Sequence, residues 1–145
     1  PPPAVEIISG VTAASEAAAV LGAPLTHDFS IISLSDLLTP WEVIEKRLRA
    51  AADADFVIVI YNPRSHGRSN LLSRAREIIM EYRSAENAVG MVKGAGREDQ
   101  QLWQTSLKGL DQLIEQADMA TIVIVGNSKT YWEQGRMITP RGYEL

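Results

Sequence analysis

The chain lacks cysteine, so disulfide bridges and thiolate-ligated metal sites are excluded. It also lacks any apolar run near the roughly 20 residues that a membrane-spanning helix requires. Histidine is scarce, and the spacing of His27 and His66 indicates neither a metal site nor a Ser-His-Asp triad. We therefore expect a cytoplasmic protein that holds no metal and does not enter a membrane.

Basic residues are in deficit, with 14 Lys and Arg against 18 Asp and Glu and a formal net charge of −4. Nucleic-acid-binding domains usually carry a basic surface excess, so we expect no nucleic-acid partner. Apolar residues, by contrast, make up 46% of the 145 residues. That share is sufficient for a packed core, and the length fits one α/β domain.

Two kinds of apolar segment alternate along the chain. Short apolar runs, most of them rich in Val or Ile, predict strands at residues 5–8, 29–34, 56–61, 88–92 and 121–125, and a further strand is predicted at residues 101–106. Amphipathic or Ala-rich segments predict helices at residues 13–21, 41–52, 70–83 and 110–116, and the tail 131–143 predicts a ragged hairpin. This order favours an α/β fold with a mixed, mostly parallel sheet of about five strands flanked by helices. The turns that follow such strands gather at one sheet edge, where ligands bind.

Three of these turns carry groups that could face a ligand. The first combines Gly10, which permits close backbone approach, with Thr12, a hydroxyl-bearing helix cap. The turn at residues 93–98 is rich in glycine but lacks the spacing of a Walker loop or a dinucleotide fingerprint. Asp36 follows the second strand and could accept a hydrogen bond. Each also has a structural interpretation: a capped helix, a tight turn and a turn-forming Asp.

A fourth turn, at residues 61–68, is cationic. Arg64 and Arg68 lie within it, and Arg74 and Arg76 follow one to two helical turns later. Because guanidinium groups bind carboxylates bidentately, these residues predict a site for a polycarboxylate ligand. The alternative is a solvated loop with surface arginines.

Six segments together resemble the second domain of the tetrapyrrole methylases. They are residues 8–13, 21–29, 33–41, 60–65, 94–98 and 124–128. The first is similar to the Pro-Gly-Val/Ile-Ser/Thr-Ala turn that opens that domain, with Ser9 in place of the proline. The resemblance spans the chain and is greatest to members that act on C-17 of a corrin precursor.

The resemblance implies a methyltransferase that uses S-adenosyl-methionine and releases S-adenosyl-homocysteine. Its substrate would be precorrin-3B or cobalt-factor III, methylated at C-17 with ring contraction in cobalamin biosynthesis. Residues 1–145 would form one α/β domain, the carboxy-terminal half of a two-domain enzyme whose N-terminal domain is missing from this sequence. We expect this half to be inactive alone and to form a homodimer.

The cofactor contacts of the family correspond to Thr12, Ala13, Tyr61, Asn62, Gly94 and Ala95. A further candidate is the lip at residues 126–128. For the substrate, we infer that Arg64 and Arg97 meet its carboxylates and that Asp36 makes a polar contact. No segment indicates a nucleophile with its base, which suits a reaction whose reactive group belongs to a cofactor.

Two other function classes stay open. The chain could be a nucleotide- or ligand-binding α/β domain without chemistry. It could also be a dimerisation domain, since a cleft face without its partner domain would be partly apolar.

Overall fold

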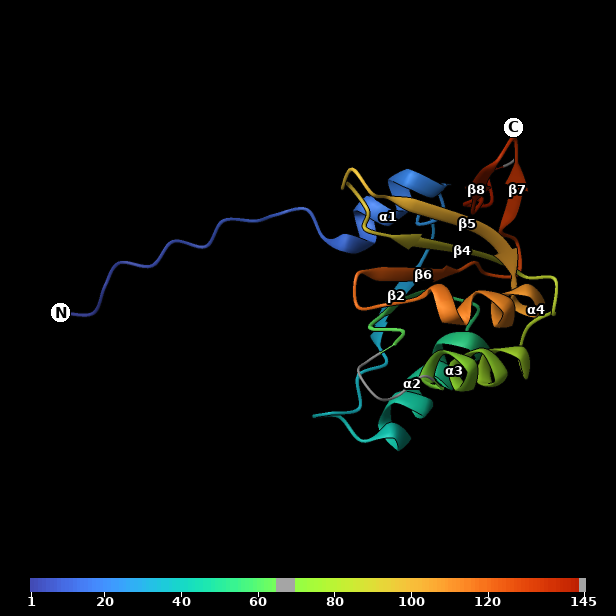
Figure 1. Ribbon diagram of the computed structural model, residues 1–145, viewed down its shortest axis with the longest axis horizontal. Helices are drawn as coiled ribbons and strands as arrows, with labels where there is room; N and C mark the ends of the chain where they lie inside the picture. Colours follow the sequence, from blue (N-terminus) through green and yellow to red (C-terminus); the bar gives the residue numbers. More distant parts are fainter. Residues whose placement is uncertain (65–69, 144–145) are drawn as a thin grey trace.

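The computed structural model describes residues 1–64 and 70–143. Its central feature is a five-stranded sheet in the order β2-β3-β6-β4-β5 (Figure 1). The strands are β2 (Phe29–Ser33), β3 (Val57–Tyr61), β4 (Ala88–Lys93), β5 (Gln101–Ser106) and β6 (Thr121–Val125). β2, β3 and β4 run in one direction, while β5 and β6 run in the other.

The mixed five-stranded sheet of an α/β fold is confirmed, but it is less parallel than predicted. Among the described strands of this sheet, β2 and β3 pair in parallel and the other three pairings are antiparallel. The difference arises because β6 lies between β3 and β4. β6 is buried at every position and β3 at all but its last, so their apolar runs carry no signal of direction.

Helices cover both faces of the sheet, because successive strand side chains point to opposite faces. The helices are α1 (Ala13–Leu21), α2 (Trp41–Asp53), α3 (Leu71–Met80), α4 (Leu107–Leu110) and the 3-10 helix η1 (Asp111–Gln116). In β3, Ile58 and Ile60 join the core under α2, α3 and α4. Val57 and Val59 join the core under α1.

The helix α1 lies close to the sheet because its buried face is largely alanine, with Ala14, Ala17 and Ala18 turned inward. Gly90 in β4 permits the same contact, since a Cβ at that position would meet Leu21 Cδ2 at 2.5 Å. This packing fixes the first turn of α1 against one edge of the sheet.

The predicted hairpin in the tail is confirmed and belongs to a second, small sheet. Its strands are β1 (Gly22–Ala23), β7 (Tyr131–Glu133) and β8 (Arg136–Ile138), in the order β1-β8-β7. This sheet adds Met137 to the core under α1.

The predicted strand at residues 5–8 is wrong. Residues 1–10 form an extended arm that leaves the body of the molecule (Figure 1). Val5, Ile7 and Ile8 are 81%, 93% and 82% exposed. A strand requires a hydrogen-bonded neighbour, and none of the strands in residues 1–64 and 70–143 pairs with the arm.

Helix boundaries differ from the predictions by a few residues. The third helix ends at Met80 rather than near Arg83, and the last begins at Leu107 before tightening into η1. The N-cap of α2 is Pro40. Among the described residues, no helix has the length and apolarity that crossing a bilayer requires.

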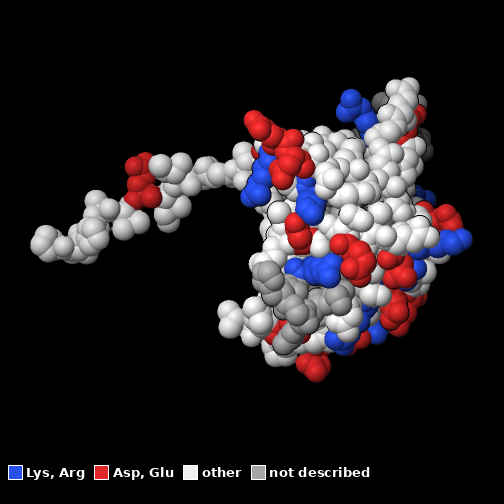
Figure 2. All heavy atoms as spheres, in the orientation of Figure 1, with Lys and Arg blue, Asp and Glu red and all other residues white. Residues whose placement is uncertain are grey.

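Charge is unevenly distributed over the face seen in Figure 2. A broad uncharged surface lies over β5 and β4, while charged side chains gather toward α3 and α4 and near the β4–β5 turn. Leu102 of the edge strand β5 is 42% exposed.

Candidate functional site

A pocket of about 410 Å³ opens where β3 and β4 end and β6 begins. We call it the strand-end pocket. Its lining consists of Val11, Ala13, Glu16, Tyr61, Asn62, Gly94, Ala95, Arg97, Met119, Ala120 and Ile122. The structure therefore brings together five of the six predicted cofactor residues. Thr12, the sixth, hydrogen-bonds to Tyr61 at its margin.

Strand direction explains this convergence. β3 and β4 run the same way, so the turns that follow them reach the same edge of the sheet. The first turn of α1 lies at that edge as well. β6 runs the opposite way and contributes the residues before it, Met119 and Ala120.

The hydroxyl of Tyr61 ties the end of β3 to the start of α1. Tyr61 Oη lies 2.6 Å from Thr12 Oγ1 and accepts a hydrogen bond from the Ala14 amide at 2.9 Å. Thr12 is the predicted N-cap, and its hydroxyl also accepts from the Ala14 amide at 3.3 Å. The two hydroxyls thus satisfy one of the amides that a helix start leaves without an intrahelical partner.

Asn62 turns the chain sharply out of β3. Its φ angle is 51°, in the left-handed region that non-glycine residues rarely adopt. The side chain is held in place, because Nδ2 donates to Ser33 Oγ at 2.9 Å. Such a backbone costs about 1–3 kcal/mol and is concentrated at functional sites.

The glycine turn after β4 forms a wall of backbone. Gly94 and Gly96 have φ angles of 64° and 77°, which favour glycine. The Gly94 amide donates to the Ala120 carbonyl at 3.0 Å, so the end of β4 is fastened to the segment before β6. The Gly96 amide donates to Gln100 Oε1 at 2.9 Å.

A family profile described as Tetrapyrrole (Corrin/Porphyrin) Methylases matches residues 2–111. The chain belongs to this family. It is 56% identical over 141 residues to the probable cobalt-factor III C(17)-methyltransferase of Salmonella typhimurium, covering 97% of this chain and 58% of that protein.

Further relatives agree in sequence and in fold. The chain is 48% identical over 124 residues to the precorrin-3B C(17)-methyltransferase of Sinorhizobium sp, covering 86% of this chain and 48% of that protein. The crystal structure of the methyltransferase CobJ superposes with a TM-score of 0.84 at 41% identity, covering 90% of this chain and 54% of that one. This chain therefore spans about half the length of the relatives it matches.

Five residues lining the strand-end pocket were not predicted to contact a ligand. Val11 lies beside the predicted Thr12 in the turn before α1. Glu16 follows Ala13 by three positions, and the helical period could have placed it on the same face. Met119, Ala120 and Ile122 had no such signal, because they precede or open a strand whose direction is opposite to that of β3.

Asp118 braces the segment that carries Met119 and Ala120. Its carboxylate accepts from the Ala120 amide at 2.8 Å and lies 3.2 Å from Lys93 Nζ. Burial acts to raise the pKa of Asp118, but the hydrogen bonds from Ala120, Lys93 and Thr121 together hold the pKa below its usual value.

The three residues predicted to meet substrate lie in different places. Arg97 lines the strand-end pocket. Arg64 points toward η1, where Nη1 donates to the Glu115 carbonyl at 3.3 Å and lies 3.4 Å from its carboxylate. Asp36 is half-buried in the loop between β2 and α2 and is not among the described residues that line this pocket. Their contact with substrate stays a prediction.

The other predicted cations are engaged in the fold or lie outside the described residues. The guanidinium of Arg74 stacks over the Trp41 ring at 4.2 Å. Arg76 donates to the carbonyls of Leu107 and Lys108. Arg74 and Arg76 therefore have structural roles, as in the alternative in which the arginines of this segment bind no ligand. Arg68, like His66, lies outside the described residues.

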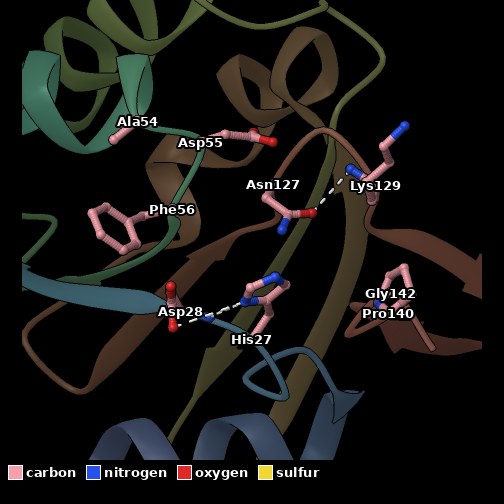
Figure 3. A pocket seen from close by; sticks show the side chains of 9 residues that line it. All are labelled: His27, Asp28, Ala54, Asp55, Phe56, Asn127, Lys129, Pro140 and Gly142. Atoms are coloured by element: carbon pink, nitrogen blue, oxygen red, sulfur yellow. Dashed lines mark hydrogen bonds and ion pairs between the residues drawn. The ribbon is translucent and has the colours of Figure 1, made fainter.

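A second pocket, of about 420 Å³, lies at the opposite edge of the sheet and is shown in Figure 3. His27, Asp28, Asp55, Asn127 and Lys129 are among its lining residues. The lip at residues 126–128 follows β6, and because β6 is antiparallel to β3 the lip lies here. Its predicted place beside the cofactor contacts is therefore wrong.

This opposite-edge pocket is surrounded by polar groups that bond to one another. Asp55 accepts from the Ser128 amide at 2.8 Å and from the Ser128 hydroxyl at 2.5 Å. The buried Arg83 donates to the Gly126 carbonyl at 2.7 Å and to the Phe56 carbonyl. Burial lowers the pKa of Arg83, and the Asp55 carboxylate, 3.8 Å from its Nε, acts in the opposite direction.

Proposed function

We propose that this chain is the carboxy-terminal, cofactor-facing half of a methyltransferase that uses S-adenosyl-methionine. Its substrate is precorrin-3B or cobalt-factor III, methylated at C-17 with ring contraction during cobalamin biosynthesis. The observation that carries the proposal is the convergence of Ala13, Asn62 and Ala95, from three separate segments, on one pocket. The names of the Salmonella and Sinorhizobium relatives support the position of methylation and the two substrates.

The strand-end pocket fits the cofactor in volume and in lining. About 410 Å³ lies within the roughly 300–1,000 Å³ typical of small-molecule sites. Ala13, Ala95 and Ile122 offer apolar surface to the adenine ring. The Asn62 amide and the Glu16 carboxylate offer polar groups to the ribose hydroxyls and to the α-ammonium group of the cofactor.

The chain's contribution to the reaction is positioning and exclusion of water. When bound, S-adenosyl-methionine supplies a methyl group whose C–S electron pair stays on sulfur, while the macrocycle carbon provides the pair for the new C–C bond. The backbone of Gly94 and Ala95 and the first turn of α1 would hold the nucleoside of the cofactor between them. Tyr61 is hydrogen-bonded to the Ala14 amide of α1, and Asn62 is hydrogen-bonded to Ser33. These bonds fix α1 and the end of β3 relative to the strand ends.

A preceding domain completes the cleft in this proposal. The chain covers 58% of the Salmonella relative, so a substantial part of that enzyme has no counterpart here. An open half-cleft would forfeit part of the roughly 7–11 kcal/mol that positioning can contribute. We therefore expect residues 1–145 to show no turnover alone.

Self-association is a further part of the proposal. β5 is an edge strand with unpaired backbone groups, and the surface over it is uncharged (Figure 2). These features support a homodimer through β5. Sedimentation equilibrium should detect it, and Leu102→Lys should weaken it. A monomer at all concentrations would contradict it.

The proposed activity is tested with a chimera. The matching 141 residues of the Salmonella relative are replaced by this chain. The chimeric protein is assayed with cobalt-factor III and S-adenosyl-methionine. The methyl group transferred to the macrocycle is detected by mass spectrometry. We expect turnover from the chimera and none from residues 1–145 alone.

Two variants of the chimera test whether turnover depends on the strand-end pocket. Asn62→Ala should impair turnover, whereas Lys129→Ala, at the opposite-edge pocket, should not. A folded chimera that binds no S-adenosyl-homocysteine, or that binds a different nucleotide instead, would overturn the proposed function.

A further inference from the structure

The opposite-edge pocket contains a buried amide group whose nitrogen has no partner in the fold. Asn127 follows β6 and is 6% exposed. Its Oδ1 accepts hydrogen bonds from the Lys129 amide at 2.9 Å, from the Thr130 amide at 3.1 Å and from the Thr130 hydroxyl at 3.2 Å. Because three donors converge on the oxygen, the orientation of the amide group is fixed. Nδ2 faces the other way, and it donates to no acceptor in the described part of the chain.

His27 presents a second donor to the same pocket. Its Nδ1 accepts a hydrogen bond from the Asp28 amide at 2.7 Å, so the proton of the neutral ring lies on Nε2. In Figure 3 the ring of His27 and the amide group of Asn127 point toward one another across the pocket. Two N–H donors therefore face one space, and residues 1–64 and 70–143 supply an acceptor to neither.

The charged groups around the pocket do not supply this acceptor. Asp55 accepts hydrogen bonds from the amide and the hydroxyl of Ser128. Asp28 is 74% exposed, and its Oδ1 lies 3.8 Å from His27 Nδ1, the ring nitrogen that carries no proton. Lys129 is exposed and forms no ion pair with any described residue. The unpaired groups of the pocket are therefore donors and a cation.

The other walls of the pocket are apolar. Ala54, Phe56 and Pro140 line it, and Figure 3 shows Phe56 and Pro140 on opposite sides. The volume of about 420 Å³ lies within the roughly 300–1,000 Å³ typical of small-molecule sites. A buried donor without an acceptor is unfavourable, so an oxygen from outside would be bound at this point. The pocket matches a small molecule with an apolar ring and an oxygen acceptor at one end.

We infer that the opposite-edge pocket binds a small aromatic oxyanion, either a carboxylate or a phosphate ester. One of its oxygens lies between Asn127 Nδ2 and His27 Nε2, and its ring lies between Phe56 and Pro140. The ammonium group of Lys129 favours an anion over a neutral acceptor. The strand-end pocket is at the other edge of the sheet, so this ligand is neither the cofactor nor the methyl acceptor. The inference goes beyond the proposed function and does not depend on it.

The test uses benzoate and phenyl phosphate as probes and benzyl alcohol as the uncharged comparison. Each is titrated into the ¹⁵N-labelled chain at constant ionic strength, and binding is followed by heteronuclear NMR. The side-chain amide resonances of Asn127 report directly on Nδ2. For probes of this size we expect dissociation constants of about 1 mM. Benzyl alcohol should leave the Asn127 resonances unchanged.

Three pairs of substitutions identify the groups that bind the probe. Asn127→Asp keeps the oxygen that accepts from Lys129 and Thr130 but replaces the donor, so binding should weaken at least about tenfold. His27→Phe should weaken binding about fivefold, and His27→Gln should recover most of that loss because its amide nitrogen replaces Nε2. Asn127→Ser, which shortens the donor, should lie between Asn127→Asp and the original chain.

The third pair concerns charge. Lys129→Gln should weaken binding about twofold at low salt and less at high salt. Lys108→Gln, at an exposed cation of α4, is the matched control and should leave the affinity unchanged. Circular dichroism should show the same fold in all variants. If Asn127→Asp does not fold, the comparison of His27→Phe with His27→Gln decides the result.

Binding of both anions that is lost in Asn127→Asp would support the inference. Binding of one anion alone would support it and identify the carboxylate or the phosphate as the source of the oxygen. The inference fails if the Asn127 resonances do not shift, since water then satisfies the two donors. It also fails if benzyl alcohol binds equally well or if Asn127→Asp retains full affinity.

A competition titration in the chimera with the Salmonella relative keeps this inference separate from the proposed function. Saturating S-adenosyl-homocysteine should leave the affinity for benzoate and phenyl phosphate unchanged. Displacement of the probe would place it in the strand-end pocket and would overturn the inference, while the proposed function would stand. Absence of S-adenosyl-homocysteine binding with the probe still bound at Asn127 would overturn the proposed function alone.

Discussion

The strand-end pocket and the opposite-edge pocket differ in construction although their volumes are almost equal, about 410 and 420 Å³. At the opposite edge, polar side chains are paired with the fold itself: Asp55 with Ser128, and Arg83 with backbone carbonyls. At the strand ends, most of the lining residues are apolar, among them Ala13, Ala95 and Ile122.

The difference teaches that volume does not identify a cofactor site in this fold. Left-handed backbone does not identify it either, since Asp55 at the opposite edge has a φ angle of 60° and Asn62 at the strand ends has one of 51°. An edge whose charged side chains are paired within the fold contributes to stability, whereas an edge lined by apolar residues offers surface to a cofactor. Substitutions at the two edges should therefore separate stability from binding.

The largest effect is expected at the opposite edge. Arg83→Leu should lower the free energy of unfolding by about 3 kcal/mol, because buried carbonyls of Gly126 and Phe56 lose their donors. Urea denaturation measures this loss. Arg83→Lys should recover part of it, since an ammonium lacks the planar fork that reaches several carbonyls. A decrease in the free energy of unfolding of less than about 1 kcal/mol would show that the hydrogen bonds of Arg83 do not stabilise this edge.

At Asn62 we expect the opposite, a loss of ligand binding with little loss of stability. Asn62→Gly should weaken S-adenosyl-homocysteine binding to the chimera about tenfold while leaving stability near its original value, because glycine accepts a φ of 51°. Asn62→Ala should weaken binding equally and also cost about 1 kcal/mol of stability. Isothermal titration calorimetry and urea denaturation distinguish the two. Full affinity in Asn62→Gly would exclude a cofactor contact by the side chain.

Tyr61→Phe should have an intermediate effect on both properties. The substitution removes the hydrogen bonds to Thr12 and to the Ala14 amide, at a cost of about 1 kcal/mol and a roughly threefold loss of S-adenosyl-homocysteine affinity. Thermal unfolding and calorimetry provide the measurements. Tyr131→Phe, at another partly exposed tyrosine, is the control and should change neither.

The smallest effect is expected from acid titration of Asp118. Its pKa in the folded chain is below the unfolded value of 3.8, so its contribution to stability is complete above that pH. The contribution is lost as the pH falls through the folded pKa. The difference in unfolding free energy between the original chain and Asp118→Asn should therefore shrink between about pH 5 and pH 2. Asp118 is 47% exposed, so the difference is small. Asp53→Asn serves as the control, and a difference that grows in acid would contradict the assignment.

Much of the local structure was predictable from the sequence. The periodicity of α2, the alanines of α1 and the continuous apolar runs of β3 and β6 predicted elements that formed within a few residues of the expected bounds. The prediction of a strand at residues 5–8 failed because an apolar pattern indicates which side chains could be buried. It does not indicate whether a neighbouring strand is present to form the hydrogen bonds.

The sequence by itself determined which residues form the glycine turn, the N-cap at Thr12 and the polar end of β3, because these depend on local backbone preferences. Only the tertiary structure decided which of them meet. The direction of β6 moved residues 126–128 to the opposite edge and brought Met119 and Ala120 into the pocket. A strand buried on both faces reads the same in either direction, so its orientation is fixed by its neighbours in the sheet and not by its own residues.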